Sequence, residues 1–403
     1  MNMFNKINVG VQQRMFTTNP ILRIDSHPFF IGPISLENDI DVPSYLPFFL
    51  DVHPKYAIPA LILTDEIRKA LSDAYSHGSM LSTPLGESAL SEDRMFEMMD
   101  NLLRLFDGDV KNLNFLEIGC GTGALLNELK KRGANVMGVE IGPQGQDGAN
   151  KFGFQVVDKP FVHGLITEKF DCIFSYGCLE HMFNLEEFFL ASRDCLKEHG
   201  LFFHSVPNSE FHFKLGSLGH LAHEHVYYFT RQNGVLLFDS QGFRAAQACT
   251  SNAGNELFIW GYYDKFATPA WPGERTEVIL EESEKLKKYS NKLVSTTNRI
   301  VTALKNMQSN NQSVGFYAGG FEYSRWLKDI DKIRYFDGDP YKHGKTWLQG
   351  LPCIESPQVL EKWPIDNLII CKDHYFEAIV QYLVEDINIP NNIKIHKLGD
   401  LAL

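Results

Sequence analysis

Short apolar runs alternate with amphipathic stretches over residues 89 to 263 of the chain. Each run is rich in β-branched and aromatic side chains and is bounded by polar or turn-forming residues, which predicts a β-strand. The stretches between the runs are long enough for helices. Strands separated by helices indicate an α/β fold, with a mostly parallel sheet covered by helices. The predicted strands cover residues 115–118, 135–139, 170–175, 201–206 and 256–260.

A long helix and a second alternating region follow this part of the chain. Residues 274–309 contain neither Pro nor Gly, and apolar residues recur near heptad spacing, which predicts one connecting helix. Residues 311–403 repeat the alternation on a smaller scale, so we expect a second, smaller α/β domain. Its predicted elements are strands at 314–317, 333–336 and 367–371 and a helix near 322–329.

These patterns divide the 403 residues into four parts. Two to three domains are the usual number for a chain of this length. An N-terminal segment with Pro-punctuated stretches contains one helical stretch near 64–76 and precedes the main core. The expected parts are the N-terminal segment at 1–88, the core at 89–263, the connecting helix at 264–310 and the C-terminal domain at 311–403.

The composition excludes several classes of partner. The chain has 38 basic and 50 acidic residues, a formal charge of −12, and no stretch is dense in Lys and Arg. A protein that neutralises nucleic acid or an anionic membrane has the opposite balance, so neither partner is expected. Apolar runs fall short of the roughly 18 residues that span a bilayer. The seven cysteines form no CxxC pair, which argues against disulfides and favours a cytoplasmic location. No feature indicates the oligomeric state.

A glycine-rich turn lies between the first predicted core strand and the helical stretch 124–132. Gly119, Gly121 and Gly123 allow a tight turn and a close approach of the backbone to a ligand. With Ala124 in the last position, the turn also fits the dinucleotide pattern GxGxxA. An NAD-dependent oxidoreductase therefore stays open as an alternative at this point.

Two acidic residues beside the turn distinguish the candidate cofactors. Glu140 ends the next predicted strand about twenty residues on, where a carboxylate accepts hydrogen bonds from ribose hydroxyls. Glu117 precedes the first glycine, and its charge would repel a pyrophosphate but suit a ligand with an ammonium group. S-adenosylmethionine combines adenosine with such a cationic tail. We therefore expect S-adenosylmethionine as cofactor, held by Glu117, Gly119, Gly121, Gly123 and Glu140.

The segment 115–123 resembles the cofactor loop of the class I S-adenosylmethionine-dependent methyltransferases. The resemblance continues through Gly138-Val139-Glu140 and through residues 170–181 and 196–208, and it covers roughly residues 89–263. It implies a Rossmann-like methyltransferase domain. His181 follows Glu180 in a pair that many methyltransferases share, which makes His181 a candidate residue of the substrate or cofactor pocket.

Five of the fourteen histidines fall between residues 204 and 225. His223 and His225 lack the HExxH spacing of a zincin and no third ligand accompanies them, so no metal site is expected. A histidine beside a carboxylate suits acid/base chemistry, because it titrates near neutrality and the acid can hold its tautomer. Glu224 and His225 are therefore the candidate catalytic pair, whereas His204 lies inside an apolar strand and is expected to be a core residue.

Glu224-His225, followed by aromatic residues, resembles the motif of the sugar C-methyltransferases, which methylate a carbon next to the ketone of a nucleotide-linked sugar. The resemblance implies that His225 is the general base and that Glu224 is its catalytic partner. It also implies an upstream aromatic residue, for which Tyr75 is the candidate, and a smaller Rossmann-like nucleotide-sugar domain that includes residues 311–360. The small-molecule substrate would be a nucleotide sugar. Methylation of oxygen or nitrogen in another metabolite is the alternative.

The chain departs from that family in three places. The family usually begins with a cysteine-ligated zinc domain, whereas the first cysteine here is Cys120. Its Gly-Gly-Ser segment appears here as residues 252–256, and its C-terminal turn, at residues 318–322, lacks the usual lysine. Lys342 and Lys345 are the remaining candidates for contact with a diphosphate.

Overall fold

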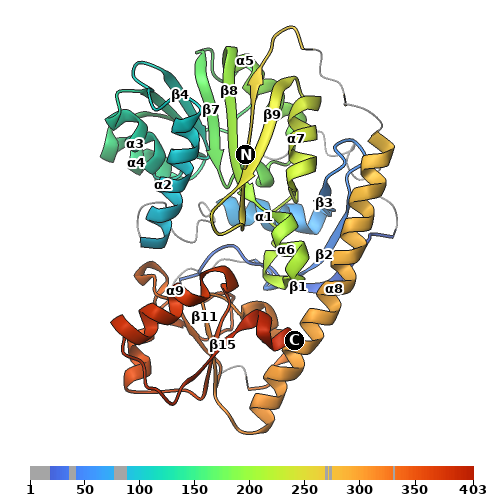
Figure 1. Ribbon diagram of the computed structural model, residues 1–403, viewed down its shortest axis with the longest axis vertical. Coiled ribbons are helices and arrows are strands. Elements are labelled where there is room, and N and C mark those ends of the chain that lie inside the picture. Colours follow the sequence, from blue (N-terminus) through green and yellow to red (C-terminus); the bar gives the residue numbers. More distant parts are fainter. Residues whose placement is uncertain (1–18, 36–41, 77–88, 268–270, 272–274, 330–331) are drawn as a thin grey trace. The chain divides into compact units, whose positions relative to one another are not determined.

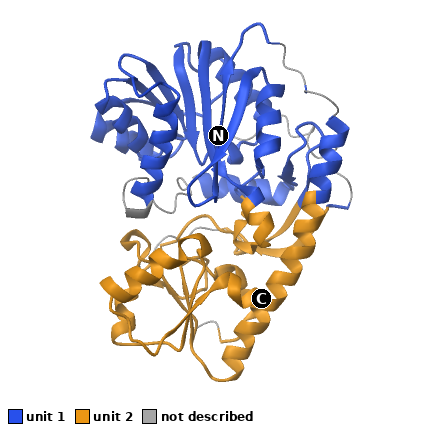
Figure 2. Ribbon diagram, in the orientation of Figure 1, with its two compact units in different colours: residues 1–20, 50–210, 224–284 blue, residues 21–49, 211–223, 285–403 orange. Residues whose placement is uncertain are grey.

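The computed structural model describes residues 19–35, 42–76, 89–267, 271, 275–329 and 332–403. The chain divides into two compact units, which Figure 2 shows in different colours. Each unit consists of three segments that are distant from one another in the sequence. The order of residues along the chain does not predict this grouping. The first unit consists of residues 1–20, 50–210 and 224–284, and the second of residues 21–49, 211–223 and 285–403.

The first unit contains a seven-stranded sheet in the order β6-β5-β4-β7-β8-β10-β9 (Figure 1). The first five strands in this order run parallel, and β10 pairs antiparallel with β8 and β9. All five predicted core strands are confirmed. The pattern does not predict β6 and β9, because one is short and the other largely exposed. The strands are β4 (Asn114–Ile118), β5 (Asn135–Val139), β6 (Gln155–Val157), β7 (Phe170–Tyr176), β8 (Leu196–Pro207), β9 (Phe243–Thr250) and β10 (Glu256–Tyr263).

Helices cover both faces of this sheet. On one face, Phe203 belongs to a core cluster with the apolar sides of α2 (Ala89–Arg104) and α3 (Ala124–Lys131). On the other face, the ring centroid of Phe202 lies 5.6 Å from that of Phe189 in α5 (Leu185–Cys195) and 5.1 Å from that of Phe238 in α7 (Arg231–Ser240). Adjacent residues of a strand point to opposite faces, so Phe202 and Phe203 reach the two cores separately.

His204 is a core residue, as its apolar strand predicts. Its side chain is buried, Nδ1 lies 2.6 Å from the Ser175 hydroxyl, and burial lowers its pKa from 6.5 to about 3. The neutral ring therefore contributes stability that is complete above pH 6.5 and is lost as the pH falls toward 3. At pH 5 the loss amounts to about 2 kcal/mol.

We expect His204→Asn to remove this share of the acid sensitivity while keeping a polar partner for Ser175. Urea titrations at pH 8 and pH 5 measure the free energy of unfolding of both proteins. The free energy of unfolding of the wild type, relative to that of the variant, should be about 2 kcal/mol lower at pH 5 than at pH 8. A difference that stays constant would contradict the assignment. His199→Ala, at an exposed position, is the matched control and should follow the wild type.

Three short strands, β1 (Leu22–Pro28), β2 (Tyr45–Val52) and β3 (Pro59–Leu61), form a small sheet in that order. Leu50 of β2 lies opposite Leu61 of β3 in an antiparallel pair. The helix that follows, α1 (Asp65–Ser76), confirms the helical stretch predicted near 64–76. It supplies Tyr75 to the first unit.

The second unit contains a five-stranded parallel sheet in the order β13-β12-β11-β14-β15. The predicted long helix is confirmed as α8 (Arg275–Ser309), and its heptad residues Leu286, Leu293, Ile300 and Leu304 are buried. Among the described residues, no helix combines the length and the apolar character needed to cross a membrane. The strands are β11 (Val314–Tyr317), β12 (Arg334–Phe336), β13 (Ile354–Glu355), β14 (Asn367–Ile370) and β15 (Lys394–Lys397), with α9 (Phe376–Gln381) before the last.

The helix predicted near 322–329 is present, but it is shorter and tighter than an α-helix. Residues Phe321–Trp326 form a 3₁₀ helix instead, in which Tyr323 N donates to Gly320 O at 3.1 Å. Gly320 enters it in a left-handed conformation with a φ of 87°. In a 3₁₀ helix, residues three apart lie on the same face, so Phe321 and Ser324 are buried together. Tyr323 is buried as well.

Candidate active site

The glycine-rich turn joins β4 to α3 in conformations that favour glycine. Gly119, Gly121 and Gly123 have φ values of 69°, 52° and 74°. A Cβ added at Gly123 would lie 2.3 Å from the Phe154 ring, and one at Gly119 would lie 2.8 Å from Cys178 Sγ. Backbone conformation and close neighbours therefore require glycine at both of these positions.

Glu140 fixes the turn from the end of β5. Its carboxylate accepts hydrogen bonds from Gly121 N at 3.0 Å and from Gly142 N at 2.8 Å. Burial raises the pKa of Glu140, although these backbone donors oppose that effect. Gly142 precedes α4 (Pro143–Phe152), so one carboxylate ties the glycine-rich turn to the start of the next helix.

Glu117 is a buried carboxyl group with an unsatisfied oxygen. Its side chain is 2% exposed, and Oε2 has no hydrogen-bond partner. Burial, followed by the charge of Glu140, raises the pKa of Glu117 well above its usual value. A buried polar atom without a partner costs free energy, which a cationic ligand group would recover. The residue predicted to receive the ammonium group of S-adenosylmethionine thus fits that group.

A second set of polar side chains follows β7. The 3₁₀ turn Leu179–His181 is held by the segment after Glu224, because Val226 N and Tyr227 N both donate to Glu180 O, at 2.8 and 3.1 Å. The same segment pairs with β3, where Leu61 N donates to Val226 O at 2.9 Å. These backbone bonds set the positions from which His181 and His225 project.

The predicted catalytic residues come together at this point. His181 Nδ1 lies 4.0 Å from Glu224 Oε2, and the ring centroids of His181 and His225 are 5.1 Å apart. Tyr75 interacts electrostatically with Glu224 and with Cys178, whose Sγ borders the glycine-rich turn. The structure therefore gathers all four of these side chains in the first unit, while their roles stay predictions.

Burial controls the protonation of the carboxyl groups. It raises the pKa of Glu224 to about 8, and it raises that of Glu180 to about 8 with help from the charge of Glu224. The pKa of His181 falls to about 3 because of burial and of His225. Near pH 7 the two acids are therefore mostly neutral and can donate hydrogen bonds, whereas the sequence suggested a carboxylate beside the histidine.

The sequence reasoning missed two further acids. In the sequence, Glu180 stands out only as part of a Glu-His pair that many methyltransferases share. Glu256, at the start of β10, accepts a hydrogen bond from the Tyr176 hydroxyl at 2.6 Å, and burial raises its pKa. The sequence signal for Glu256 is its position as the last residue of segment 252–256, which departs from the family pattern.

Three of the clustered histidines, His212, His220 and His223, belong to the second unit. His223 Nε2 lies 3.2 Å from Pro47 O, and its ring packs against Phe29 and Phe48. His212 and His220 stack on each other with ring centroids 4.2 Å apart. The five neighbours in the sequence thus serve different parts of the structure, and His225 is the one that joins His181.

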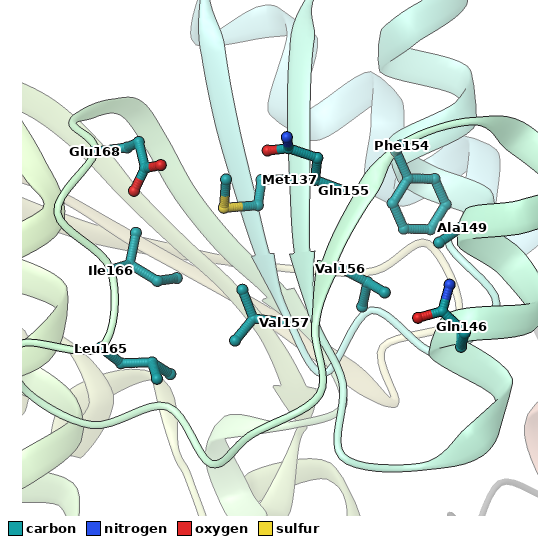
Figure 3. A pocket seen from close by; sticks show the side chains of 10 residues that line it. All are labelled: Met137, Gln146, Ala149, Phe154, Gln155, Val156, Val157, Leu165, Ile166 and Glu168. Carbon is teal, nitrogen blue, oxygen red and sulfur yellow. The ribbon is translucent and has the colours of Figure 1, made fainter.

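A pocket of about 500 Å³ opens beside β6, and Figure 3 shows its lining. None of the predicted site residues lines it. Its walls combine apolar side chains with the polar side chains of Gln146, Gln155 and Glu168. The lining residues are Met137, Gln146, Ala149, Phe154, Gln155, Val156, Val157, Leu165, Ile166 and Glu168.

Comparison with known proteins identifies the main domain. Residues 91–248 match the family model described as a methyltransferase domain. The ubiquinone biosynthesis O-methyltransferase of Pelagibacter ubique (strain HTCC1062) is 27% identical over 117 residues, which cover 27% of this chain and 48% of that protein. The chain thus matches about half the length of this curated relative.

Solved structures with similar chains include two methyltransferases. The S-adenosylmethionine-dependent methyltransferase of Mesorhizobium loti has 16% identity and a TM-score of 0.33, with 40% of this chain and 96% of that chain covered. The N-methyltransferase NodS of Bradyrhizobium japonicum WM9 has 14% identity and a TM-score of 0.34, with 45% and 100% covered.

Residues 91–248 are a methyltransferase domain. It is an enzyme domain of the S-adenosylmethionine-dependent class, and S-adenosylmethionine is its methyl donor. The NAD-dependent alternative is wrong, because the glycine-rich turn that it shares belongs to this domain.

Proposed function

We propose that the chain methylates a small molecule, and that the methylated atom is a carbon next to the ketone of a nucleotide-linked sugar. The observation that carries the proposal is the meeting of His225, His181, Glu224 and Tyr75. A carbon next to a ketone becomes a nucleophile only after it loses a proton, so this chemistry needs a base and a donor for the enolate oxygen.

The side chains divide the work as follows. When bound, S-adenosylmethionine supplies an electrophilic methyl group. Glu117 would hold its ammonium group and Glu140 its ribose hydroxyls. His225 takes the proton from the carbon as the C–H bond breaks, and its ring becomes the imidazolium. The Tyr75 phenol donates a hydrogen bond to the ketone oxygen, where the electron pair collects.

We propose further that the five-stranded parallel sheet belongs to a smaller Rossmann-like domain that serves the nucleotide portion. The four-part division of the chain at 1–88, 89–263, 264–310 and 311–403 is part of this proposal. A cytoplasmic location, with neither nucleic acid nor membrane as partner, remains the prediction from composition.

Methylation of oxygen is the second candidate. One observation favours it, and another weakens the case for a nucleotide sugar. The curated relative is named as an O-methyltransferase. In addition, Lys342 Nζ lies 2.9 Å from Asp337 Oδ2 and 3.8 Å from Asp339 Oδ2, so its charge is already paired rather than held for a diphosphate. The ammonium group of Lys345 also has a partner, because its Nζ lies 3.4 Å from the Tyr341 ring centroid.

A labelled methyl group distinguishes the two candidates. Thermal-shift screening of nucleotide sugars with S-adenosylhomocysteine present should find an acceptor, since a ligand of the native state raises its apparent stability. The acceptor is then prepared with uniform ¹³C labelling in its sugar and reacted with ¹³C-methyl S-adenosylmethionine. Methylation of carbon should give a methyl signal that is split by the neighbouring ring carbon. A methyl signal without carbon coupling would replace carbon methylation by attack of oxygen or nitrogen.

Tyr75→Phe tests the donor to the enolate oxygen. Loss of one such donor should lower kcat by about 10²-fold and leave the affinity for S-adenosylhomocysteine unchanged. Tyr262→Phe, at a half-buried tyrosine of β10, is the control and should keep the wild-type rate. Steady-state kinetics with the acceptor and calorimetry with S-adenosylhomocysteine measure the two effects. A Tyr75→Phe enzyme as fast as the wild type would remove this role.

A further inference from the structure

Three potential metal ligands converge after β7. Glu180, His181 and His225 each offer one ligand atom, and these atoms all lie within 4.8 Å of one another. We propose that this cluster binds a divalent transition-metal ion that competes with the substrate proton for His225. The competition rests on the proposed function, in which His225 is the base. The binding of the ion itself does not depend on that function.

The donor set indicates the kind of ion. Two imidazoles and one carboxyl group, which would release its proton when the ion binds, suit Zn²⁺, Fe²⁺ or Co²⁺. Mg²⁺ and Ca²⁺ prefer oxygen ligands alone. Ligand atoms about 2.0–2.2 Å from one ion lie roughly 3–3.5 Å apart. His181 Nε2 and Glu180 Oε1 are 3.6 Å apart, so small side-chain rotations bring them to this spacing.

A second observation points to a cation. Glu180 is 2% exposed, and its Oε2 has no hydrogen-bond partner. A buried carboxyl oxygen without a partner is costly, and a bound cation would satisfy it. Glu224 Oε2, 4.0 Å from His181 Nδ1, is placed to orient that ring from the other side, as carboxyl groups often do behind metal-bound histidines.

The sequence-based expectation of no metal site is therefore revised. It rested on the spacing of His223 and His225 and on the lack of a third ligand beside them. In the structure His223 packs on Pro47 in the second unit, and the missing ligands are Glu180 and His181, which the chain brings from the end of another strand.

The ion has a direct consequence for the chemistry. A ring nitrogen of His225 has one lone pair, which accepts either a proton or a metal ion. While the ion is bound, that nitrogen cannot remove the proton from the substrate carbon. The site would then be active without metal and inhibited by it.

Cobalt binding tests the site without any substrate. Purified protein is treated with EDTA, dialysed, and titrated with Co²⁺ while the visible absorption is recorded. We expect saturation at one equivalent per chain and displacement by Zn²⁺. Glu180→Gln and His181→Ala should weaken binding by at least about 10- to 100-fold, the usual cost of losing even an outer-shell partner of a ligand. His199→Ala, at an exposed histidine, should bind like the wild type. Calorimetry with S-adenosylhomocysteine verifies that each variant folds.

Absence of a saturable cobalt signal, or equal binding by Glu180→Gln, overturns the site. Methyl transfer to the acceptor, assayed with EDTA and with added Zn²⁺, tests the competition. Full activity in EDTA and inhibition over the range in which Zn²⁺ displaces Co²⁺ support it, and activity that requires metal overturns it. If His225→Ala loses cobalt binding but keeps its turnover, the proposed function fails while the metal site stands.

Discussion

Replacing His225 by Ala is expected to lower kcat by about 10² to 10⁴-fold, the usual contribution of a general base. The affinity for S-adenosylhomocysteine should stay close to that of the wild type, because the proposal assigns cofactor binding to Glu117 and Glu140 and not to His225. Equal losses in kcat and kcat/KM would indicate that the interaction is made only in the transition state. Steady-state kinetics with the acceptor and calorimetric titration measure these quantities.

Two controls make this result specific. His199→Ala changes an exposed histidine and should leave both the rate and the affinity unchanged. His225→Gln keeps a polar side chain without a base and should be as slow as the Ala variant. Wild-type turnover in His225→Ala would remove the mechanism, whereas a parallel loss of cofactor affinity would point to a structural role.

Replacing Glu117 by Gln is expected to weaken binding of S-adenosylhomocysteine by about 10- to 100-fold, because the loss of a hydrogen bond to a charged group costs about 1.5–3 kcal/mol. The unliganded protein should be at least as stable as the wild type. Burial already favours the neutral form of this carboxyl group, and Gln has nearly the same shape. Affinity and stability should thus change in opposite directions.

The raised pKa of Glu117 also predicts a proton release. In the free protein, burial favours the protonated carboxyl group of Glu117, whereas a bound ammonium group favours the carboxylate. Affinity should therefore rise with pH until it passes the pKa of the free protein. Calorimetry in two buffers with different heats of ionisation counts the released protons. The Glu117→Gln protein should release fewer, and an equal release from both would contradict the assignment to Glu117.

The residues proposed to bind the cofactor are predictable because the sequence features that mark them lie within short stretches of the chain. Gly119 and Gly123 are needed for a turn of a few residues, and Glu140 reaches that turn from the next strand. The backbone conformations and the strand spacing follow from short stretches of sequence. The same reasoning predicts the five core strands, whose apolar runs reflect burial in the sheet.

The grouping of the predicted catalytic side chains is harder to predict from the sequence. Glu224 and His225 are adjacent in the chain, yet the carboxyl group of Glu224 lies beside His181. His223 carries the same apparent signal and packs in the second unit. Which side chains meet depends here on the backbone bonds from Val226 and Tyr227 to Glu180 O, which join segments from separate parts of the sheet.

Local sequence patterns specify the α/β alternation, the long helix and the glycine-rich turn, and they include the acids and histidines that chemistry could use. These features depend on periodicity and backbone conformation, which act over a few residues. The folded chain is needed to see that Glu180 lies with His181 and His225, and that one buried oxygen of Glu117 and one of Glu180 lack hydrogen-bond partners. Desolvation and partner choice depend on all the segments packed around a group, because electrostatic interactions strengthen as water is excluded by the whole fold.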